Sequence, residues 1–265
     1  MNRSSSTALG GLAALLLATS ACRPDPPATE QPAKTPATTE AAAPNAPSTS
    51  TAADTLHLPG GQVAELRPTT AVAFNQLPAS SLYDMPNDPA TEALAATQGR
   101  VRRQGLHLLL QPVQGSAVRL TSTATEAALQ NGGVKYQYWG SLPAAHQWVV
   151  RAWYWEASGA MLVDQRTGRR LQELPGDPVA APDGCLVLLT SPGLGGGDQP
   201  NALSLVQIDA TGPRLLWQRE PTTWEPVEAR WASPTRAILK LRHLNAQGEM
   251  PDDAPETYAE LSLLR

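Results

Sequence analysis

The chain has 265 residues, of which 42% are hydrophobic and 17% are charged, and its formal net charge is −4 at pH 7. This share of apolar residues is enough to bury a hydrophobic core. The slightly acidic balance argues against a surface that binds nucleic acid, because phosphate binding needs clustered Lys and Arg, so we expect no nucleic-acid partner.

Residues 1–21 are predicted to be a lipoprotein signal peptide. Arg3 supplies a positive charge near the start, and Ala8 to Ala18 form an apolar run that is too short for a permanent membrane helix. The run ends in Thr19-Ser20-Ala21-Cys22, which resembles the bacterial lipobox, where small residues precede a Cys that becomes acylated. We therefore expect lipidation of Cys22 and export to the cell envelope, with the protein anchored to a membrane that faces the periplasm or the cell surface. Because a Thr stands where the lipobox usually has Leu, ordinary cleavage and secretion without lipid is the alternative.

Residues 22–54 are predicted to form a disordered tether. They consist almost entirely of Pro, Ala, Thr and Ser with scattered charges, and they lack the large apolar side chains that would offset the entropy of folding. Such a segment would hold the folded part of the chain away from a membrane surface.

The second cysteine of the chain is Cys185, in the apolar run CLVLLT. No cation or helix N-terminus adjoins it in the sequence to activate a thiol, so it is interpreted as a structural residue. Lipid on Cys22 would exclude a disulfide between the two cysteines.

Residues 55–265 are expected to form one β domain. In its first part, up to residue 100, the pattern predicts a single element, a short helix over Pro89 to Gln98. Asp88 is placed to cap the start of this helix, and Gly99 to end it in a left-handed conformation.

After Gln104 the pattern is typical of strands. Apolar runs of strand length recur, and Gly-, Pro- and Asn-rich turns separate them. The runs QWVVRAWYW and CLVLLT are apolar on both faces, as expected for sheets that are stacked between other sheets. One helix-like interruption covers Thr123 to Gln130, where Thr123 and Glu126 have capping-box spacing.

A weak internal repeat accompanies these strands. Asp164-Gln165-Arg166-Thr167-Gly168 matches Asp209-Ala210-Thr211-Gly212, with the two Thr-Gly turns 44 residues apart. In both copies the Asp is expected to accept hydrogen bonds from the backbone of its turn, which is a structural role. Several short strands within such a period are typical of propeller blades. The predicted fold is therefore all-β, with antiparallel propeller-like repeats in about four blades or an incomplete propeller, and one or two short helices.

The turn motifs also carry a family resemblance. Val163 to Gly168 (V-D-x-x-T-G), followed by Pro182-Asp183-Gly184 before an apolar strand, resembles the WD-type propeller repeats of TolB and related bacterial envelope proteins. The stretch from Tyr136 to Leu241 is also similar to bacterial lipoproteins that carry a few such repeats. The resemblance implies a binding or scaffold role, although propellers host many functions.

Catalytic patterns are absent from the sequence. There is no G-x-S-x-G elbow, no H-E-x-x-H and no C-x-x-C, and the four histidines lie far apart. We therefore expect no catalytic residue, no metal and no cofactor. Arg100, Arg102 and Arg103 follow the predicted helix, where they would complement its dipole, and an anion site is the alternative.

The tryptophans are the residues that most favour a binding function. All seven lie between Trp139 and Trp231. Trp153 and Trp155 are expected to share one strand face, and Trp224, beside two prolines, is the hardest to assign to a core, so these three are the candidate binding residues. Packing between blades is the alternative for all of them.

Three functions are compatible with these patterns. The leading hypothesis is a non-catalytic envelope lipoprotein that acts as an interaction or scaffold module, with a protein or a glycan as partner. The alternatives are a periplasmic hydrolase or glycan-processing enzyme with carboxylates in a Trp-lined cleft, and a domain that senses a small ligand.

Overall fold

The computed structural model describes residues 55–57, 63–82, 94–196 and 199–263, and these fold mainly into antiparallel β-sheets with short helices. The prediction of an all-β fold is therefore confirmed. The described residues form four sheets, which we call sheets I to IV in the order in which most of the chain passes through them. Cys22, together with the predicted signal peptide and tether, lies outside the described residues.

Sheets I and II each have three strands that follow one another along the chain. Sheet I contains β3 (Val101–Gln104), β4 (His107–Leu110) and β5 (Val118–Thr121). Sheet II contains β6 (Lys135–Leu142), β7 (Gln147–Trp153) and β8 (Ser158–Asp164).

Sheets III and IV are larger. Sheet III has the order β12-β11-β10-β9, with β9 (Asp177–Ala180), β10 (Leu186–Ser191), β11 (Ala202–Asp209) and β12 (Gly212–Arg219). Sheet IV has the order β1-β2-β15-β14-β13, with β1 (Thr55–His57), β2 (Val63–Pro68), β13 (Trp224–Ser233), β14 (Arg236–His243) and β15 (Glu256–Leu263). Strands from both ends of the described chain thus share one sheet, because β2 pairs with β15 in the register Leu66 to Leu261.

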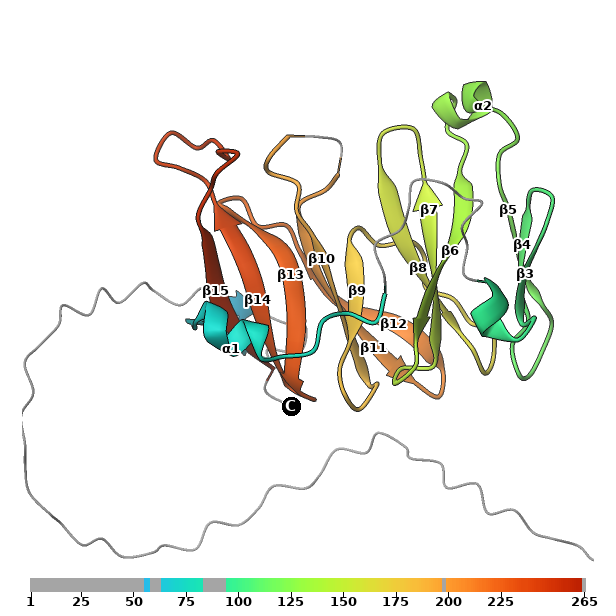
Figure 1. Cartoon of the computed structure of the whole chain (residues 1–265), viewed down its shortest axis with the longest axis horizontal. Coiled ribbons are helices and arrows are strands. Elements are labelled where there is room, and N and C mark those ends of the chain that lie inside the picture. Colours follow the sequence, from blue (N-terminus) through green and yellow to red (C-terminus); the bar gives the residue numbers. More distant parts are fainter. Residues whose placement is uncertain (1–54, 58–62, 83–93, 197–198, 264–265) are drawn as a thin grey trace, which may run out of the picture.

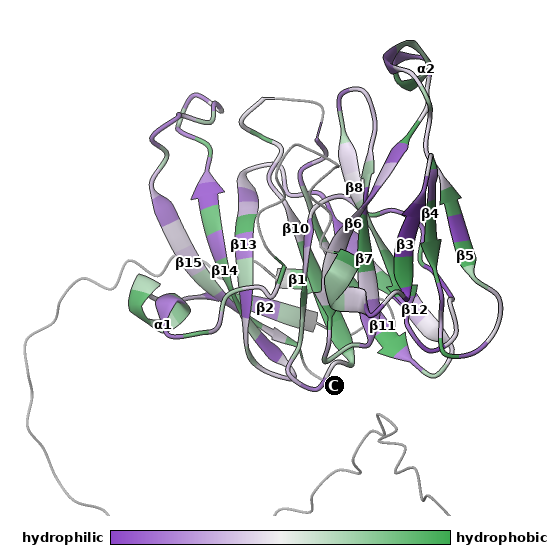
Figure 2. Ribbon diagram, turned by 45° about the vertical axis from the view of Figure 1, so that its right-hand side comes forward, coloured by the Kyte–Doolittle hydropathy of each residue, from purple (hydrophilic) through white to green (hydrophobic). Residues whose placement is uncertain are grey.

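The four sheets stand side by side in a row, from sheet IV at the left of Figure 1 to sheet I at the right. A hydrophobic cluster lies between each pair of neighbours. Leu108 and Val150 belong to the cluster between sheets I and II, and Leu239 belongs to the one between sheets III and IV. Apolar stretches along the strands of the row are visible in Figure 2. Each fully buried Leu or Val contributes about 1.5–3 kcal/mol, so the packing of sheet on sheet holds the fold together.

Strand β10 shows why its sequence is apolar on both faces. Val187 and Leu189 point into the cluster shared with sheet II, whereas Leu186 and Leu188 belong to the cluster shared with sheet IV. Because successive side chains of a strand alternate between faces, a strand between two packed neighbours must be apolar throughout. The expectation of stacked sheets is confirmed here. Cys185 lies just before β10, half-buried in the preceding turn.

The helices are short and differ in part from the prediction. Helix α1 (Ala71–Asn75) was not predicted; Thr70 caps it, and Phe74 packs against Tyr258 of sheet IV. The N-cap of helix α2 (Glu126–Gln130) lies two residues later than expected, because Thr125 caps the helix while the Thr123 hydroxyl accepts a hydrogen bond from the backbone N–H of Val134.

Of the helix predicted over residues 89–98, the structure describes only the end, as the 3-10 helix η2 (Leu94–Thr97). The remainder, with Asp88, lies outside the described residues. Gly99 has the expected left-handed conformation, with φ of 77°. Within the described ranges, each helix is too short or too polar to cross a membrane.

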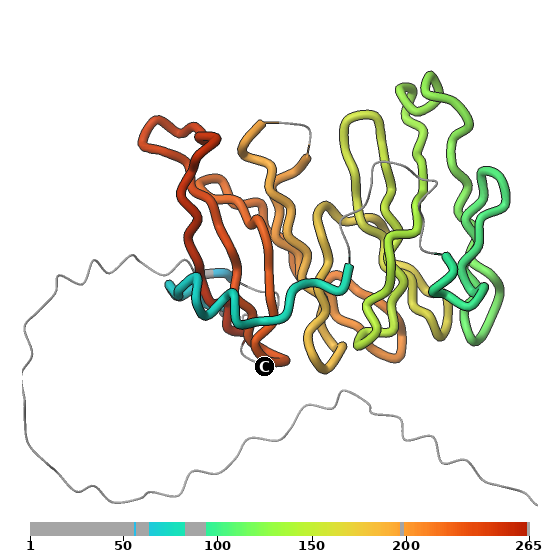
Figure 3. Tube along the Cα trace, viewed as in Figure 1, coloured from blue at the N-terminus to red at the C-terminus, as the bar shows by residue number. Residues whose placement is uncertain are grey.

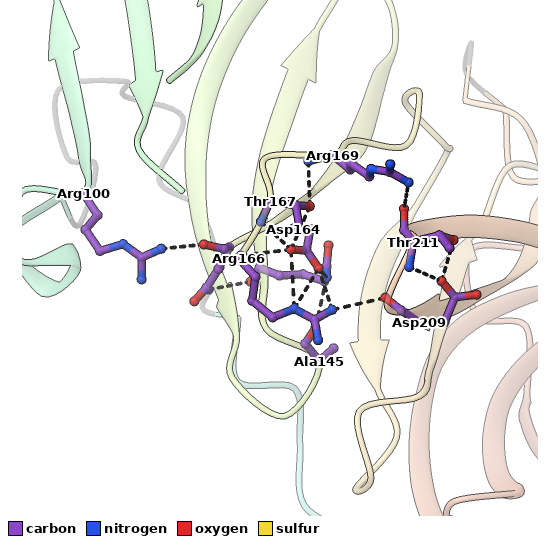
Figure 4. Close-up of polar contacts among 10 residues, drawn as sticks. Arg100, Ala145, Asp164, Arg166, Thr167, Arg169, Asp209 and Thr211 are labelled. Carbon is purple, nitrogen blue, oxygen red and sulfur yellow. Dashed lines mark hydrogen bonds and ion pairs between the residues drawn. The ribbon is translucent and has the colours of Figure 1, made fainter. Parts of the chain in front are cut away.

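The two Thr-Gly turns of the repeat share a hydrogen bond from the backbone N–H of the Thr to the carboxylate of the preceding Asp. The Asp164 carboxylate accepts from the backbone N–H of Thr167 at 2.8 Å, and the Asp209 carboxylate accepts from that of Thr211 at 2.6 Å. Figure 4 shows that arginines of the first turn reach the second: Arg166 donates to the Asp209 carbonyl at 3.2 Å. Asp164 and Asp209 therefore have the structural role that the repeat predicts, and the turns also join sheets II and III.

Candidate functional site

A cavity of about 480 Å³ opens among β6 of sheet II, β9 of sheet III and β13 of sheet IV, each of which is an edge strand of its sheet. Its volume lies within the range of small-ligand sites. The apolar part of its wall includes Leu82, Trp139 and Val179, and the polar part includes Ser80, Asp177, Thr190 and Glu228. We call this space the central cavity.

The central cavity is bounded by a piece of chain that crosses between sheets. Residues 76–82, the crossing segment, follow α1 and pass from sheet IV toward sheet II, as Figure 3 shows. The Arg230 guanidinium donates to the Leu77 carbonyl at 3.2 Å, and the Ser81 hydroxyl donates to the Ser141 carbonyl at 3.3 Å. These bonds hold the segment to strands β13 and β6, and a second, smaller cavity of about 280 Å³ lies along it.

Arg151 of β7 is the central charged residue of this region. Its guanidinium carbon lies 3.6 Å from the centre of the Trp139 ring, and its Nη2 is 2.9 Å from the Asp177 carboxylate. Its Nη1 donates to the Ser158 hydroxyl at 3.3 Å. Burial lowers the pKa of Arg151, and the attraction of Asp177 only partly opposes that effect. Stacking on the aromatic ring and pairing with the carboxylate offset the cost of removing the cation from water.

The second carboxylate of the central cavity, Glu228, is also paired. Its Oε1 lies 2.8 Å from Arg230 Nε, and its Oε2 lies 3.9 Å from Lys240 Nζ. The carboxylates of Asp177 and Glu228 thus offer hydrogen-bond acceptors to the central cavity. Among the residues that the structure describes, no group of three or more His, Cys, Asp or Glu could hold a metal ion.

The hairpin between β7 and β8 carries exposed aromatic rings beside this region. The backbone N–H of Tyr154 donates to the Ala157 carbonyl at 2.8 Å, which makes the turn tight. Tyr154 is 39% exposed and Trp155 is 50% exposed. The prediction that Trp153 and Trp155 share a strand face is wrong, because β7 ends at Trp153 and Trp155 lies in the turn.

Trp153 is half-buried and connects the exposed rings to the Arg151 site. Its indole N–H donates to the Gln137 side chain at 2.9 Å, and the Arg151 guanidinium lies 5.7 Å from its ring centre. Nearby, burial and then the charge of Glu173 raise the pKa of Tyr154, so its hydroxyl remains a donor at neutral pH. The contacts form a continuous path from the hairpin, through Trp153 and Arg151, to the wall of the central cavity.

Trp224 lies elsewhere, and it is buried. It is 5% exposed and belongs to the cluster between sheets III and IV, so the expectation that it lies outside a core is wrong. The neighbouring Pro226 is part of β13, an edge strand of sheet IV that tolerates a proline. The strand consequently begins at Trp224, and the packing of the sheets buries the ring.

Sequence reasoning missed the residues that form the central cavity. Trp139, Asp177 and Glu228 come from three sheets, and no local pattern links them. Arg151 had a signal, since it is the one charged residue in the run QWVVRAWYW. No family model matches the chain, and no curated protein and no solved structure is significantly similar to it.

Proposed function

We propose that the protein is an exported lipoprotein, anchored through Cys22, whose β domain is a non-catalytic module that binds a glycan in the cell envelope. The lipobox-like start and the tether composition support the anchor. The exposed aromatic pair at the β7–β8 hairpin carries the binding part of the proposal.

The fold that we propose is an incomplete propeller of four blades, each blade being one of the sheets. Edge strands of sheets II, III and IV, namely β6, β9 and β13, all border the central cavity, as innermost strands of a propeller border its axis. The two Thr-Gly turns that link sheets II and III, each preceded by an Asp, are consistent with blade repeats like those of TolB. Sheets I and IV stand at opposite ends of the row, which leaves the ring open (Figure 1).

A glycan fits the aromatic hairpin for a chemical reason. Tyr154 and Trp155 present broad apolar faces on a tight turn, so little conformational entropy is lost when a sugar ring stacks on them. The acceptors Asp177 and Glu228 could bond sugar hydroxyls in the adjoining cavity. A protein partner would use the same rings as anchors, and the test below includes it as the opposing outcome.

The test compares aromatic and non-aromatic surface variants. A chain that lacks the signal and carries Cys22→Ser is incubated with insoluble peptidoglycan, chitin or cellulose, and the bound fraction is measured. The double variant Tyr154→Ala with Trp155→Ala should bind at least about tenfold more weakly. The control variant, Val72→Ala with Leu215→Ala, removes two other exposed apolar side chains and should bind normally. No binding by the unaltered chain, or an equal loss in both variants, would overturn the glycan proposal.

Lipidation is tested separately. Mass spectrometry of the membrane form should find acyl groups on Cys22 as the mature N-terminus. An unmodified N-terminus would contradict the anchor and leave the glycan result unaffected.

A hydrolase is the second candidate, because the central cavity places Asp177 and Glu228 near Trp139. Two carboxylates flanking a sugar are the usual catalytic pair of glycosidases. If the chain released sugars from any of the glycans above, and Asp177→Asn and Glu228→Gln each abolished the release, the non-catalytic proposal would be replaced by this one.

A further inference from the structure

Sheet I ends the row, and one of its faces covers no other sheet. Val101, Leu108, Leu110 and Leu120 fill the cluster shared with sheet II. The alternate residues form what we call the outer face: Arg102, Gln104, His107, Leu109, Arg119 and Thr121. Figures 1 and 2 both show this sheet at the right-hand end of the row.

The strand register arranges the outer face in two rows. Arg102 is opposite Leu109, which is opposite Arg119, so two cations flank one apolar side chain. In the second row, His107 accepts a hydrogen bond from Arg119 at its Nε2, and its Nδ1 lies 3.1 Å from the Thr121 hydroxyl. Leu106, in the turn beside this row, is 43% exposed.

Among the residues that the structure describes, no acid pairs with these cations. The sequence has no Asp or Glu between Glu92 and Glu126, although the whole chain has a net charge of −4. Both Arg102 and Arg119 are exposed, and neither takes part in an ion pair within the described part of the chain. The outer face is therefore a positive surface on an acidic protein.

The other end of the row is different. On sheet IV, the cations are matched by carboxylates of the same sheet: Arg67 with Glu65, Arg236 with Glu260, and Lys240 with Glu256. Within the described residues, unmatched positive charge thus distinguishes the outer face of sheet I from sheet IV.

The structure also divides the arginines that follow η2. Arg100 donates to the Gln165 carbonyl at 2.6 Å, and Arg103 donates to the Tyr136 carbonyl at 2.7 Å, so both join sheet I to sheet II. Arg102 points to the opposite face and has no such bond among the described residues. Arg100 and Arg103 therefore have a structural role in holding the two sheets together, whereas the Arg102 side chain can contact a partner.

We propose that the outer face of sheet I docks on an anionic phospholipid membrane. Arg102 and Arg119 would contact lipid phosphates, while Leu106 and Leu109 would lie against the headgroup region. This proposal depends on the proposed lipid anchor in one respect: the anchor is the reason for choosing a lipid surface, rather than another anionic partner. Residues 22–54 number 33, and at 3.1 Å each they reach at most about 100 Å. A folded chain of this size is roughly 45 Å across, so the anchor permits either end of the row to meet the membrane.

The experiment uses the unlipidated chain, with Cys22→Ser and without the signal, so that the anchor cannot contribute. Its partition onto phosphatidylcholine vesicles is measured by cosedimentation, with and without phosphatidylglycerol. Partition should increase with the anionic lipid and fall with salt, because the attraction is electrostatic. Each arginine near an anionic surface is worth about a fivefold change in partition. The double variant Arg102→Glu with Arg119→Glu should therefore lose about 25-fold or more.

The matched control is Arg67→Glu with Arg214→Glu. It changes the net charge equally but acts on sheets IV and III, and it should retain most of the partition onto anionic vesicles. An equal loss in both double variants would show that only net charge matters and would overturn the proposal. Equal partition onto neutral and anionic vesicles would also overturn it, as would binding to dextran sulfate without vesicle binding, which would identify an acidic polysaccharide. These outcomes do not involve Tyr154 or Trp155, so failure here is distinguishable from failure of glycan binding.

Discussion

Replacing Asp164 with Ala should destabilise the domain by about 3 kcal/mol, whereas Asp209→Ala should cost only about 1 kcal/mol. The two residues occupy equivalent turns, but the Asp164 side chain is fully buried and that of Asp209 is in an exposed turn. The difference therefore compares a buried turn, whose carboxylate also has an ion-pair partner, with an exposed turn of the same repeat.

The larger value follows from the partners of Asp164. One carboxylate oxygen accepts from the backbone N–H groups of Arg166 and Thr167 at 2.9 and 2.8 Å, and the other lies 2.7 Å from Arg166 Nη2. The second oxygen also accepts from the buried Gln147 amide at 3.3 Å. Water can reach the turn of the variant, but not Gln147, so that amide loses a partner at a cost of about 1–3 kcal/mol. The loss of the other hydrogen bonds to the charged carboxylate accounts for the rest of the expected loss of about 3 kcal/mol.

The effect should depend on pH. Burial by itself raises the pKa of Asp164, but the Arg166 side chain and the N–H groups of the turn outweigh it and hold the pKa below its usual value. A group whose pKa is lowered by folding stabilises the protein above its unfolded pKa of about 3.9 and loses that effect as the pH falls through the folded pKa. The gap between the unaltered chain and Asp164→Ala should therefore narrow below about pH 4.

Urea unfolding followed by tryptophan fluorescence at about pH 7 and about pH 3 measures both effects. Asp164→Asn is the control, because an amide oxygen can still accept from the turn while the charge is lost, and we expect an intermediate loss of stability. Equal destabilisation by Asp164→Ala and Asp209→Ala, or a gap that is unchanged at low pH, would refute the reasoning.

Trp224→Ala should destabilise the domain by about 3–5 kcal/mol in the same assay, because the ring lies in the core. Glycan binding per folded molecule should be unchanged. Loss of glycan binding in a variant of unchanged stability would contradict the assignment of Trp224 to the core. Gly184→Ala should lower the thermal midpoint strongly, since a Cβ there would overlap the Ala144 carbonyl oxygen, and the residue has a φ of +71°. Gly99→Ala is its control, with a similar φ but open space around the added atom, and should cost only about 1 kcal/mol. A calorimetric scan that ranked these two glycine variants equally would show that the close approach of the two turns does not constrain the fold.

Local chemistry predicted the parts of the fold that depend on neighbouring residues. Asp164 and Asp209 bond their own turns, so the motif that contains them was sufficient to assign their role. The apolar pattern of CLVLLT indicated a strand covered on both sides, and β10 confirms it. The boundaries were less accurate, as Thr125 rather than Thr123 caps α2.

Elements that depend on distant partners were missed. Strand β2 has no clear alternation of its own, and its position is set by pairing with β15 at the other end of the chain. Trp224 was misassigned because its prolines suggested a loop, whereas β13 begins at that residue. Arg151 and Asp177 are 26 positions apart and meet only because sheets II and III pack together.

By itself, the amino-acid order determined that the chain would form short antiparallel strands with tight turns, since backbone preferences and alternation act between adjacent residues. It also determined that the stretch with Arg102 and Arg119 contains no acid, because no Asp or Glu occurs from residue 93 to residue 125. Only the tertiary structure decided which tryptophans are buried, which carboxylates share the central cavity, and that Arg102 and Arg119 lie on one open face. These outcomes depend on how whole sheets stack and pair, and that packing is governed by contacts between residues far apart in the chain.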